Sequence, residues 1–184
     1  FEWTAPADWP VSPQSGVKNY TYSSSVETNP ATPITTALRE GNFTLSLLSG
    51  GVYNFLVKAN DLAGNQSVEG VAPYRFDNHA PAAVVANTVL ETHGAQSGVW
   101  NNIDHPVFSW GAVSEPNTGA TESGVFNYDV YWGEEAGGQV ITTTVTDTSY
   151  NPGALLPDKT YYLRLRTRDN AGNTANWNTV FIHS

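Results

Sequence analysis

The chain has 184 residues, 40% hydrophobic and only 14% charged, so it is expected to fold and not to be a disordered polyampholyte. Its formal net charge of -9, with only 8 lysines and arginines, argues against nucleic acid as a partner, because phosphate binding needs clustered cations. The lack of cysteine excludes a disulfide framework and most structural zinc sites. No apolar run approaches the ~20 residues that cross a bilayer, so no membrane span is predicted.

An internal repeat with a period of about 108 residues organises the chain. Four pairs of similar segments, which we call anchors, follow one another in the same order and indicate a duplication. The duplication predicts two modules, residues 1–78 and 79–184, joined at a run of turn formers. Because no residues precede the first anchor of the first module, we expect the chain to be a piece of a longer polypeptide. The first strand of this module is then either cut off or supplied by another segment at the sheet edge. The matching segments are FEW 1–3 with FSW 108–110, SGV 15–17 with SGV 123–125, 53–57 with 161–165, and DLAGN 61–65 with DNAGN 169–173.

Alternating apolar and polar residues predict short strands bounded by Gly, Pro, Asn and Asp. In chain order these are 53–60, 107–110, 128–132, 140–145, 161–168 and 178–183. In the strand at 161–168, Tyr161, Leu163, Leu165 and Thr167 are expected to face inward, opposite three arginines. Short strands at this spacing predict an all-β protein built from two tandem β-sandwiches.

The segment LLPDKTY (155–161) resembles the L-x-P-G-T-x-Y run before strand F of fibronectin type III domains. Trp3 and Trp110 stand where that family has its strand-B tryptophan, and Tyr20 and Tyr128 where strand C begins. The resemblance implies tandem fibronectin type III or immunoglobulin-like sandwiches, the first lacking its N-terminal strand. SGVxxY with YYLRLRTRDNAGN is also similar to repeats of large bacterial surface proteins and secreted hydrolases, which implies an extracellular or cell-surface location.

The two DxAGN strings have two interpretations. Asp and Asn bond to nearby backbone and Gly supplies a positive φ, so the string suits the hairpin between strands F and G. Alternatively, Asp61 or Asp169, with loop carbonyls and an acidic residue such as Asp8 or Glu115, could bind calcium through oxygen. No other cofactor is predicted.

Two sets of side chains are candidates for ligand binding. Arg164, Arg166 and Arg168 form a cationic stripe that could contact an anionic glycan or an acidic module, or could instead pair with acids on neighbouring strands. Trp132 and Trp177 could stack on sugars, or could instead close the ends of the sandwich.

Three triplets fit the acceptor sequence for N-glycosylation, at Asn19, Asn42 and Asn65, all in the first module. A chain rich in Ser, Thr and Asn also produces such triplets by chance.

No catalytic motif is present: the sequence lacks a cysteine nucleophile, GxSxG, HExxH and a phosphate-binding loop, so it is not expected to be an enzyme. It predicts a non-catalytic structural, adhesive or spacer module of an extracellular bacterial surface protein or fibre. Its partners would be neighbouring modules, or copies of itself through a sheet edge. The alternative is a carbohydrate-binding accessory region of a secreted hydrolase.

Overall fold

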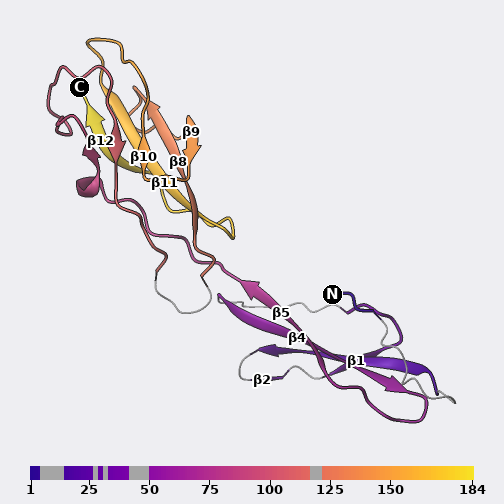
Figure 1. The fold of residues 1–184 in the computed structure, drawn as a ribbon. Coiled ribbons are helices and arrows are strands. Elements are labelled where there is room, and N and C mark those ends of the chain that lie inside the picture. The colour runs from indigo at the N-terminus through magenta and orange to yellow at the C-terminus, as the bar shows by residue number, and fades with distance from the viewer. Residues whose placement is uncertain (5–14, 27–28, 31–32, 42–49, 117–121) are drawn as a thin grey trace. The chain divides into compact units, whose positions relative to one another are not determined.

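A computed structural model describes residues 1–4, 15–26, 29–30, 33–41, 50–116 and 122–184. These residues form two compact units, Phe1–Phe76 and Asp77–Ser184, each built on antiparallel sheets (Figure 1). The all-β class predicted from the sequence is confirmed. The division between the units falls just before Asp77, whereas the sequence placed it after residue 78. The reason is local, since Asp77 accepts hydrogen bonds from Ser123 and Asn173, both of unit 2.

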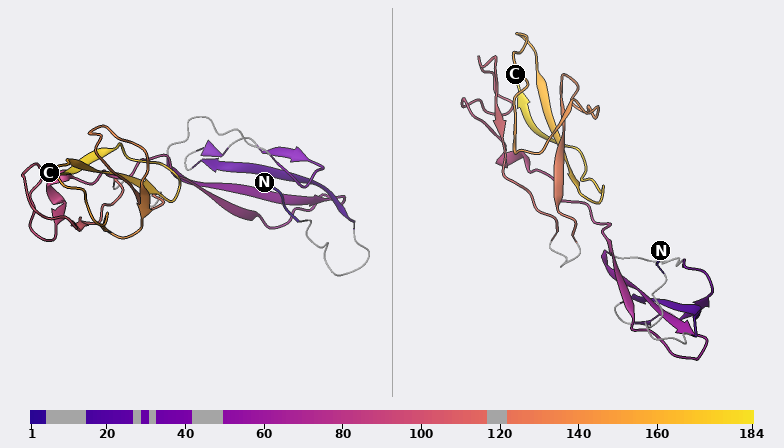
Figure 2. Two further views of the ribbon diagram at one scale, coloured as in Figure 1. Left: turned by 90° about the horizontal axis from the view of Figure 1, so that it is seen from above. Right: turned by 45° about the vertical axis from the view of Figure 1, so that its right-hand side comes forward.

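The described residues of unit 1 form a five-stranded antiparallel sheet, visible in Figure 2. The strands run in the order β2-β1-β4-β5, and β3 also pairs with β1. Outside this sheet, Glu2 forms a bridge with Glu40. The strand predicted at 53–60 lies within the observed β4. The bounds are β1 Val17–Val26, β2 Asn29–Pro30, β3 Ile34–Thr36, β4 Gly51–Asp61 and β5 Gly70–Phe76.

Aromatic rings form the core of unit 1. Tyr20, Tyr22 and Phe55 are buried, and the ring of Trp3 lies 5.4 Å from that of Tyr20 and 5.7 Å from that of Phe55. Phe1 stacks on Phe55 with ring centroids 4.4 Å apart. The FEW anchor therefore packs its two aromatic residues against the sheet. The prediction that this unit lacks a first strand stays a prediction.

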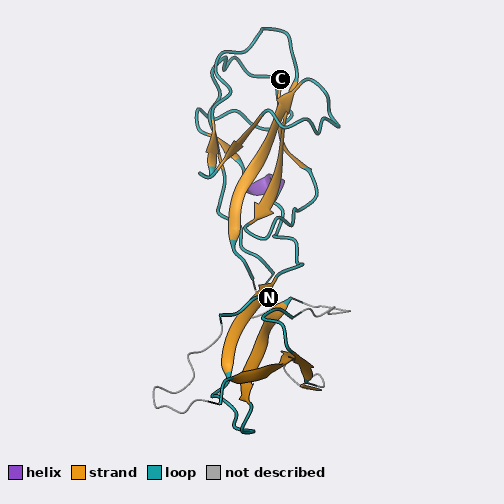
Figure 3. Ribbon diagram, turned by 90° about the vertical axis from the view of Figure 1, so that its right-hand side faces the viewer, coloured by secondary structure: helices purple, strands orange, loops and turns teal. Residues whose placement is uncertain are grey.

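Unit 2 stacks two antiparallel sheets, with strand orders β10-β7-β6 and β12-β11-β8-β9. Figure 3 shows that both units consist of strands joined by loops, with one short helical turn in unit 2. The three-residue η1 is the one helix formed by the described residues, and none is long and apolar enough to cross a membrane. The bounds are η1 Ala86–Thr88, β6 Leu90–Glu91, β7 Phe108–Ser109, β8 Val125–Gly133, β9 Thr143–Val145, β10 Ser149–Tyr150, β11 Tyr161–Asp169 and β12 Asn178–His183.

The two sheets of unit 2 enclose its core. Phe108 and Leu163 are fully buried there, and Trp110 lies edge-on to Tyr128 with ring centroids 5.5 Å apart. In β11, Leu163, Leu165 and Thr167 are buried as the alternation predicted. The predicted strand at 140–145 is too long, because its first residues are exposed and pairing with β8 begins only at Thr143. The predicted strand at 178–183 agrees with β12.

Candidate metal centre

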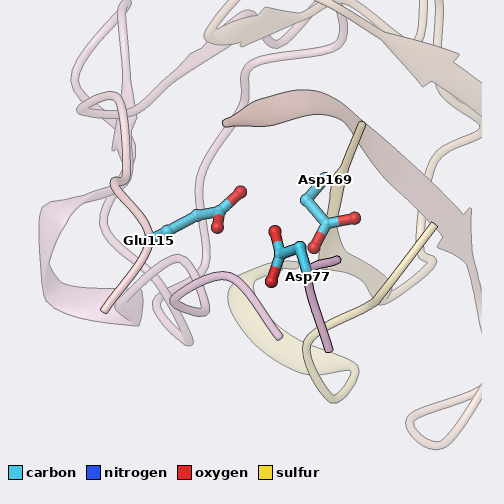
Figure 4. A group of neighbouring side chains, drawn as sticks. All are labelled: Asp77, Glu115 and Asp169. Atoms are coloured by element: carbon cyan, nitrogen blue, oxygen red, sulfur yellow. The ribbon is translucent and has the colours of Figure 1, made fainter. Parts of the chain in front are cut away.

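Three carboxylates from distant parts of the chain meet in unit 2 (Figure 4). Asp77 is the first residue of the unit, Glu115 lies between β7 and β8, and Asp169 is the last residue of β11. One oxygen from each side chain lies within 4.8 Å of one from each of the others. We call these three residues the carboxylate triad. Like charges this close disfavour full ionisation unless a cation or a proton neutralises them.

Hydrogen bonds hold the two aspartates of the triad in place. Asp77 Oδ1 accepts the His79 N–H at 3.0 Å, and Oδ2 accepts the Ser123 N–H at 2.7 Å. Asp169 accepts both the N–H and the side-chain Nδ2 of Asn173, at 2.7 and 2.8 Å. Burial raises the pKa of Asp77, whereas the hydrogen bonds that it accepts lower it. Together the hydrogen bonds outweigh burial, so the pKa lies below its usual value. Each carboxylate oxygen keeps a lone pair for another ligand.

Glu115 differs from the two aspartates because neither of its oxygens has a hydrogen-bond partner among the described residues. The residue is only 6% exposed, and Figure 4 shows its carboxylate pointing toward Asp77 and Asp169. Burial raises the pKa of Glu115, and the negative charges of the two aspartates and of Glu122 raise it further. The Gly124 N–H opposes this rise weakly, but it lies outside hydrogen-bond geometry. An unpaired buried carboxylate is costly, so this position favours a proton or a cation.

The triad contains two of the four residues predicted as calcium ligands. The structure brings Asp169 and Glu115 together, whereas Asp8 lies outside the described residues. Asp77 was not predicted as a ligand, because it lies at the predicted boundary between the two modules and outside the aligned segments of the repeat. The sequence signal that could have indicated a role for Asp77 is its position directly before a run of turn-forming residues.

Asp61 makes the same hairpin hydrogen bonds as Asp169 but is not part of the carboxylate triad. Asp61 accepts the N–H and the Nδ2 of Asn65, both at 2.7 Å, as Asp169 does from Asn173. These hydrogen bonds lower the pKa of Asp61, and the bond from the Asn65 side chain has the largest effect. Among the residues that the structure describes, no second group of three metal-ligating side chains gathers around it. The DxAGN string therefore closes a hairpin in both units, and within the described residues only the second copy adjoins other carboxylates.

The arginine stripe makes contacts within unit 2. Arg166 donates from Nε and Nη2 to Asp129 Oδ2 at 3.0 and 2.6 Å, and Arg168 donates to the same oxygen at 3.2 Å. Asp129 is fully buried. Arg164 donates to the Gly138 carbonyl at 2.6 Å. This arrangement matches the interpretation that the stripe pairs with a neighbouring strand, and binding of a glycan or an acidic module stays a prediction.

The two candidate sugar-stacking tryptophans are half-buried. Trp132 stacks on Tyr161 with ring centroids 5.2 Å apart and planes inclined by 3°. The guanidinium of Arg166 lies 4.9 Å above the ring of Trp177. Each contact covers a ring face that sugar stacking would use. Trp100, at 77% exposure, is the tryptophan of unit 2 that is open to solvent.

The glycosylation candidates in the described region have partners in unit 1. Asn19 Oδ1 accepts a hydrogen bond from Asn60 at 2.8 Å. Asn65 donates its Nδ2, the atom that would carry a glycan, to Asp61 Oδ2. Asn42 lies outside the described residues. Glycosylation stays a prediction.

Comparisons with known proteins give two partial relatives. No family model matches the sequence. The chain is 31% identical over 139 residues to Exoglucanase B of Cellulomonas fimi, and 31% identical over 140 residues to Chitinase A1 of Niallia circulans. The alignments cover 70% and 72% of this chain but only 11% and 17% of those relatives.

Among the solved structures that resemble the chain, two match it over most of its length at low identity. The fibronectin(III)-like modules of Clostridium thermocellum CbhA match with a TM-score of 0.41 and 16% identity, over 94% of this chain and 80% of that one. The FN1–FN3 domains of chicken CNTN1 match with a TM-score of 0.40 and 16% identity, over 90% of this chain and 56% of that one.

The strand arrangement of unit 2 agrees with the resemblance found in the sequence. A three-stranded and a four-stranded antiparallel sheet enclose the core, as in the immunoglobulin-like sandwiches. Trp110 follows β7 and is buried against Tyr128 of β8. These are two of the positions at which the sequence resembles fibronectin type III domains. The fold class expected from the sequence is therefore confirmed: the chain is an all-β protein, and unit 2 has the two-sheet arrangement expected from the resemblance to fibronectin type III domains.

Proposed function

We propose that this chain is a non-catalytic spacer segment of a larger secreted bacterial enzyme that degrades a polysaccharide. The observation that carries the proposal is the distribution of the sequence matches. About the same length of chain is equally similar to part of an exoglucanase and part of a chitinase, two enzymes named for different activities. Each match covers only a small part of the enzyme, 11% of one and 17% of the other, which favours a part that does not determine either activity.

The contacts of the ionisable side chains support a structural role. Glu91 accepts backbone hydrogen bonds from the β6–β7 segment, and Asp129 binds two arginines of β11. His105 pairs with Asp104 at 2.8 Å, but both side chains are exposed, at 65% and 78%. Such an exposed pair lacks the desolvated surroundings that tune catalytic groups.

The first test uses the purified 184-residue chain with insoluble cellulose and chitin. The spacer proposal expects no release of reducing sugar and no saturable loss of protein from the supernatant. Saturable binding that Trp100→Ala abolishes would instead establish the carbohydrate-binding alternative. Binding abolished only by Trp177→Ala would do the same and would show that the Arg166 contact opens.

A second test uses the parent enzyme. Deletion of this segment is expected to leave kcat/KM on a soluble oligosaccharide unchanged, because the segment does not touch the reacting bond. A large fall in kcat/KM on the soluble substrate would refute a spacer role. The adhesive role in a surface protein or fibre is a separate proposal, and concentration-dependent self-association in sedimentation velocity would support it.

A further inference from the structure

We propose that Asp77, Glu115 and Asp169 bind one calcium ion in unit 2. The proposal is independent of the spacer function, because cation binding is measured on the chain itself. It rests on two observations: the convergence of three carboxylates, and a buried glutamate among them with no hydrogen-bond partner in the part of the chain that the structure describes.

The spacing of the carboxylates suits a shared ion. Calcium is bound by oxygen at ~2.3–2.6 Å, so ligands on opposite sides of the ion lie up to about 5 Å apart. One oxygen of each carboxylate falls within 4.8 Å of those of the other two. An ion placed between them can therefore reach all three side chains without a large backbone movement.

The two aspartates are oriented before any ion arrives. Asp77 is held by the N–H groups of His79 and Ser123, and Asp169 by two bonds from Asn173. Asn173 also donates to the Asp77 carbonyl at 3.1 Å, which links the start of the unit to the turn after β11. Ligands that are already ordered lose little conformational entropy on binding.

Glu115 supplies the second observation. Both of its oxygens are buried and have no hydrogen-bond partner within residues 50–116 and 122–184 or the rest of the described chain, and the side chain points toward the two aspartates (Figure 4). Among the described residues, His79 is the only basic side chain that forms an ion pair with the triad, and it contacts Asp77 at 3.8 Å. One histidine cannot balance three carboxylates, so most of the negative charge at this point is not compensated within the described structure.

The donor set favours calcium over other common divalent ions. All three side chains offer oxygen, whereas structural zinc sites use cysteine and histidine. Magnesium requires near-ideal octahedral geometry at ~2.1 Å, so its opposite ligands lie only about 4.2 Å apart. Calcium accepts six to eight oxygens in irregular arrangements, and bidentate carboxylates together with water can complete the shell.

Isothermal titration of calcium into the full chain, first stripped with chelator, tests the proposal. We expect one site with a Kd of about 10⁻⁴ to 10⁻³ M, the range of extracellular modules. Glu115→Gln should abolish the binding heat. Asp61→Asn is the control, because it alters the equivalent aspartate of the DxAGN hairpin in unit 1 and leaves the triad intact, and it should retain binding. No heat at millimolar calcium, or full binding by Glu115→Gln, overturns the proposal.

Thermal unfolding separates a ligand role of Glu115 from a structural one. Calcium should raise the Tm of the wild-type chain by several degrees over its value in chelator, because the ion binds only the folded state. In chelator, Glu115→Gln should melt at the wild-type temperature or above it, since it removes a buried unpaired charge. A lower Tm of Glu115→Gln in chelator, with no calcium response of the wild type, would assign Glu115 to packing alone. Equal stabilisation by magnesium and calcium would overturn the choice of ion.

Discussion

Glu91 is the residue whose replacement tests the sandwich of unit 2 most directly. Its carboxylate is fully buried and accepts four hydrogen bonds. Oε1 accepts the Val107 N–H at 3.0 Å and the His93 ring at 2.8 Å. Oε2 accepts the N–H groups of His93 and Ala95 at 2.8 and 3.1 Å. Because both oxygens accept backbone N–H groups, Glu91→Gln must aim an amide N–H at one of these donors.

The loss of stability in Glu91→Gln depends on which of its two orientations the new amide adopts, and the one that breaks fewer hydrogen bonds sets the loss. With the new NH₂ at the Oε1 position, the Val107 N–H loses its partner, which costs ~1–3 kcal/mol. The two remaining backbone bonds lose charge assistance, which adds roughly 1 kcal/mol. We therefore expect Glu91→Gln to lower the free energy of unfolding of unit 2 by about 2–4 kcal/mol.

Urea unfolding followed by tryptophan fluorescence measures this loss, since four of the six tryptophans (Trp100, Trp110, Trp132 and Trp177) lie in unit 2. The control is Glu134→Gln, which alters an exposed glutamate paired with Lys159 and should leave the midpoint unchanged. If Glu91→Gln unfolds at the wild-type midpoint, the four hydrogen bonds do not stabilise the unit and the reasoning is wrong.

Three further predictions concern unit 2. Asp129→Asn should lower the free energy of unfolding by about 3 kcal/mol in urea, because two guanidinium groups lose a buried carboxylate; an unchanged midpoint would contradict this. Gly138→Ala should cost ~1–3 kcal/mol in the same assay, since its new methyl group collides with the Tyr131 ring, whereas Gly137→Ala meets open space and should be neutral. Burial lowers the pKa of His183, so the unfolded chain binds its proton more readily and Tm should fall as pH drops below about 6.5; His183→Asn should reduce that slope.

Much of the fold could be predicted from local sequence patterns. The alternation in 161–168 placed Leu163, Leu165 and Thr167 in the core, and the structure agrees. The DxAGN hairpin was predicted correctly because its bonds join residues four positions apart. The predicted ends of the strand at 140–145 were less accurate, because apolar character alone does not show at which residue the pairing with the neighbouring strand begins.

The candidate site depended on contacts that no local pattern contains. The sequence by itself determined the all-β class, the strand faces and the Asp-Asn hairpins, and it offered Asp61, Asp169, Asp8 and Glu115 as acidic candidates. The tertiary structure decided that Asp77 joins these two, that Asp129 engages the arginines of β11, and that Trp132 stacks on Tyr161. The physical reason is sequence separation: Asp77 and Asn173 lie 96 positions apart, and only the packing of the two sheets brings such residues together.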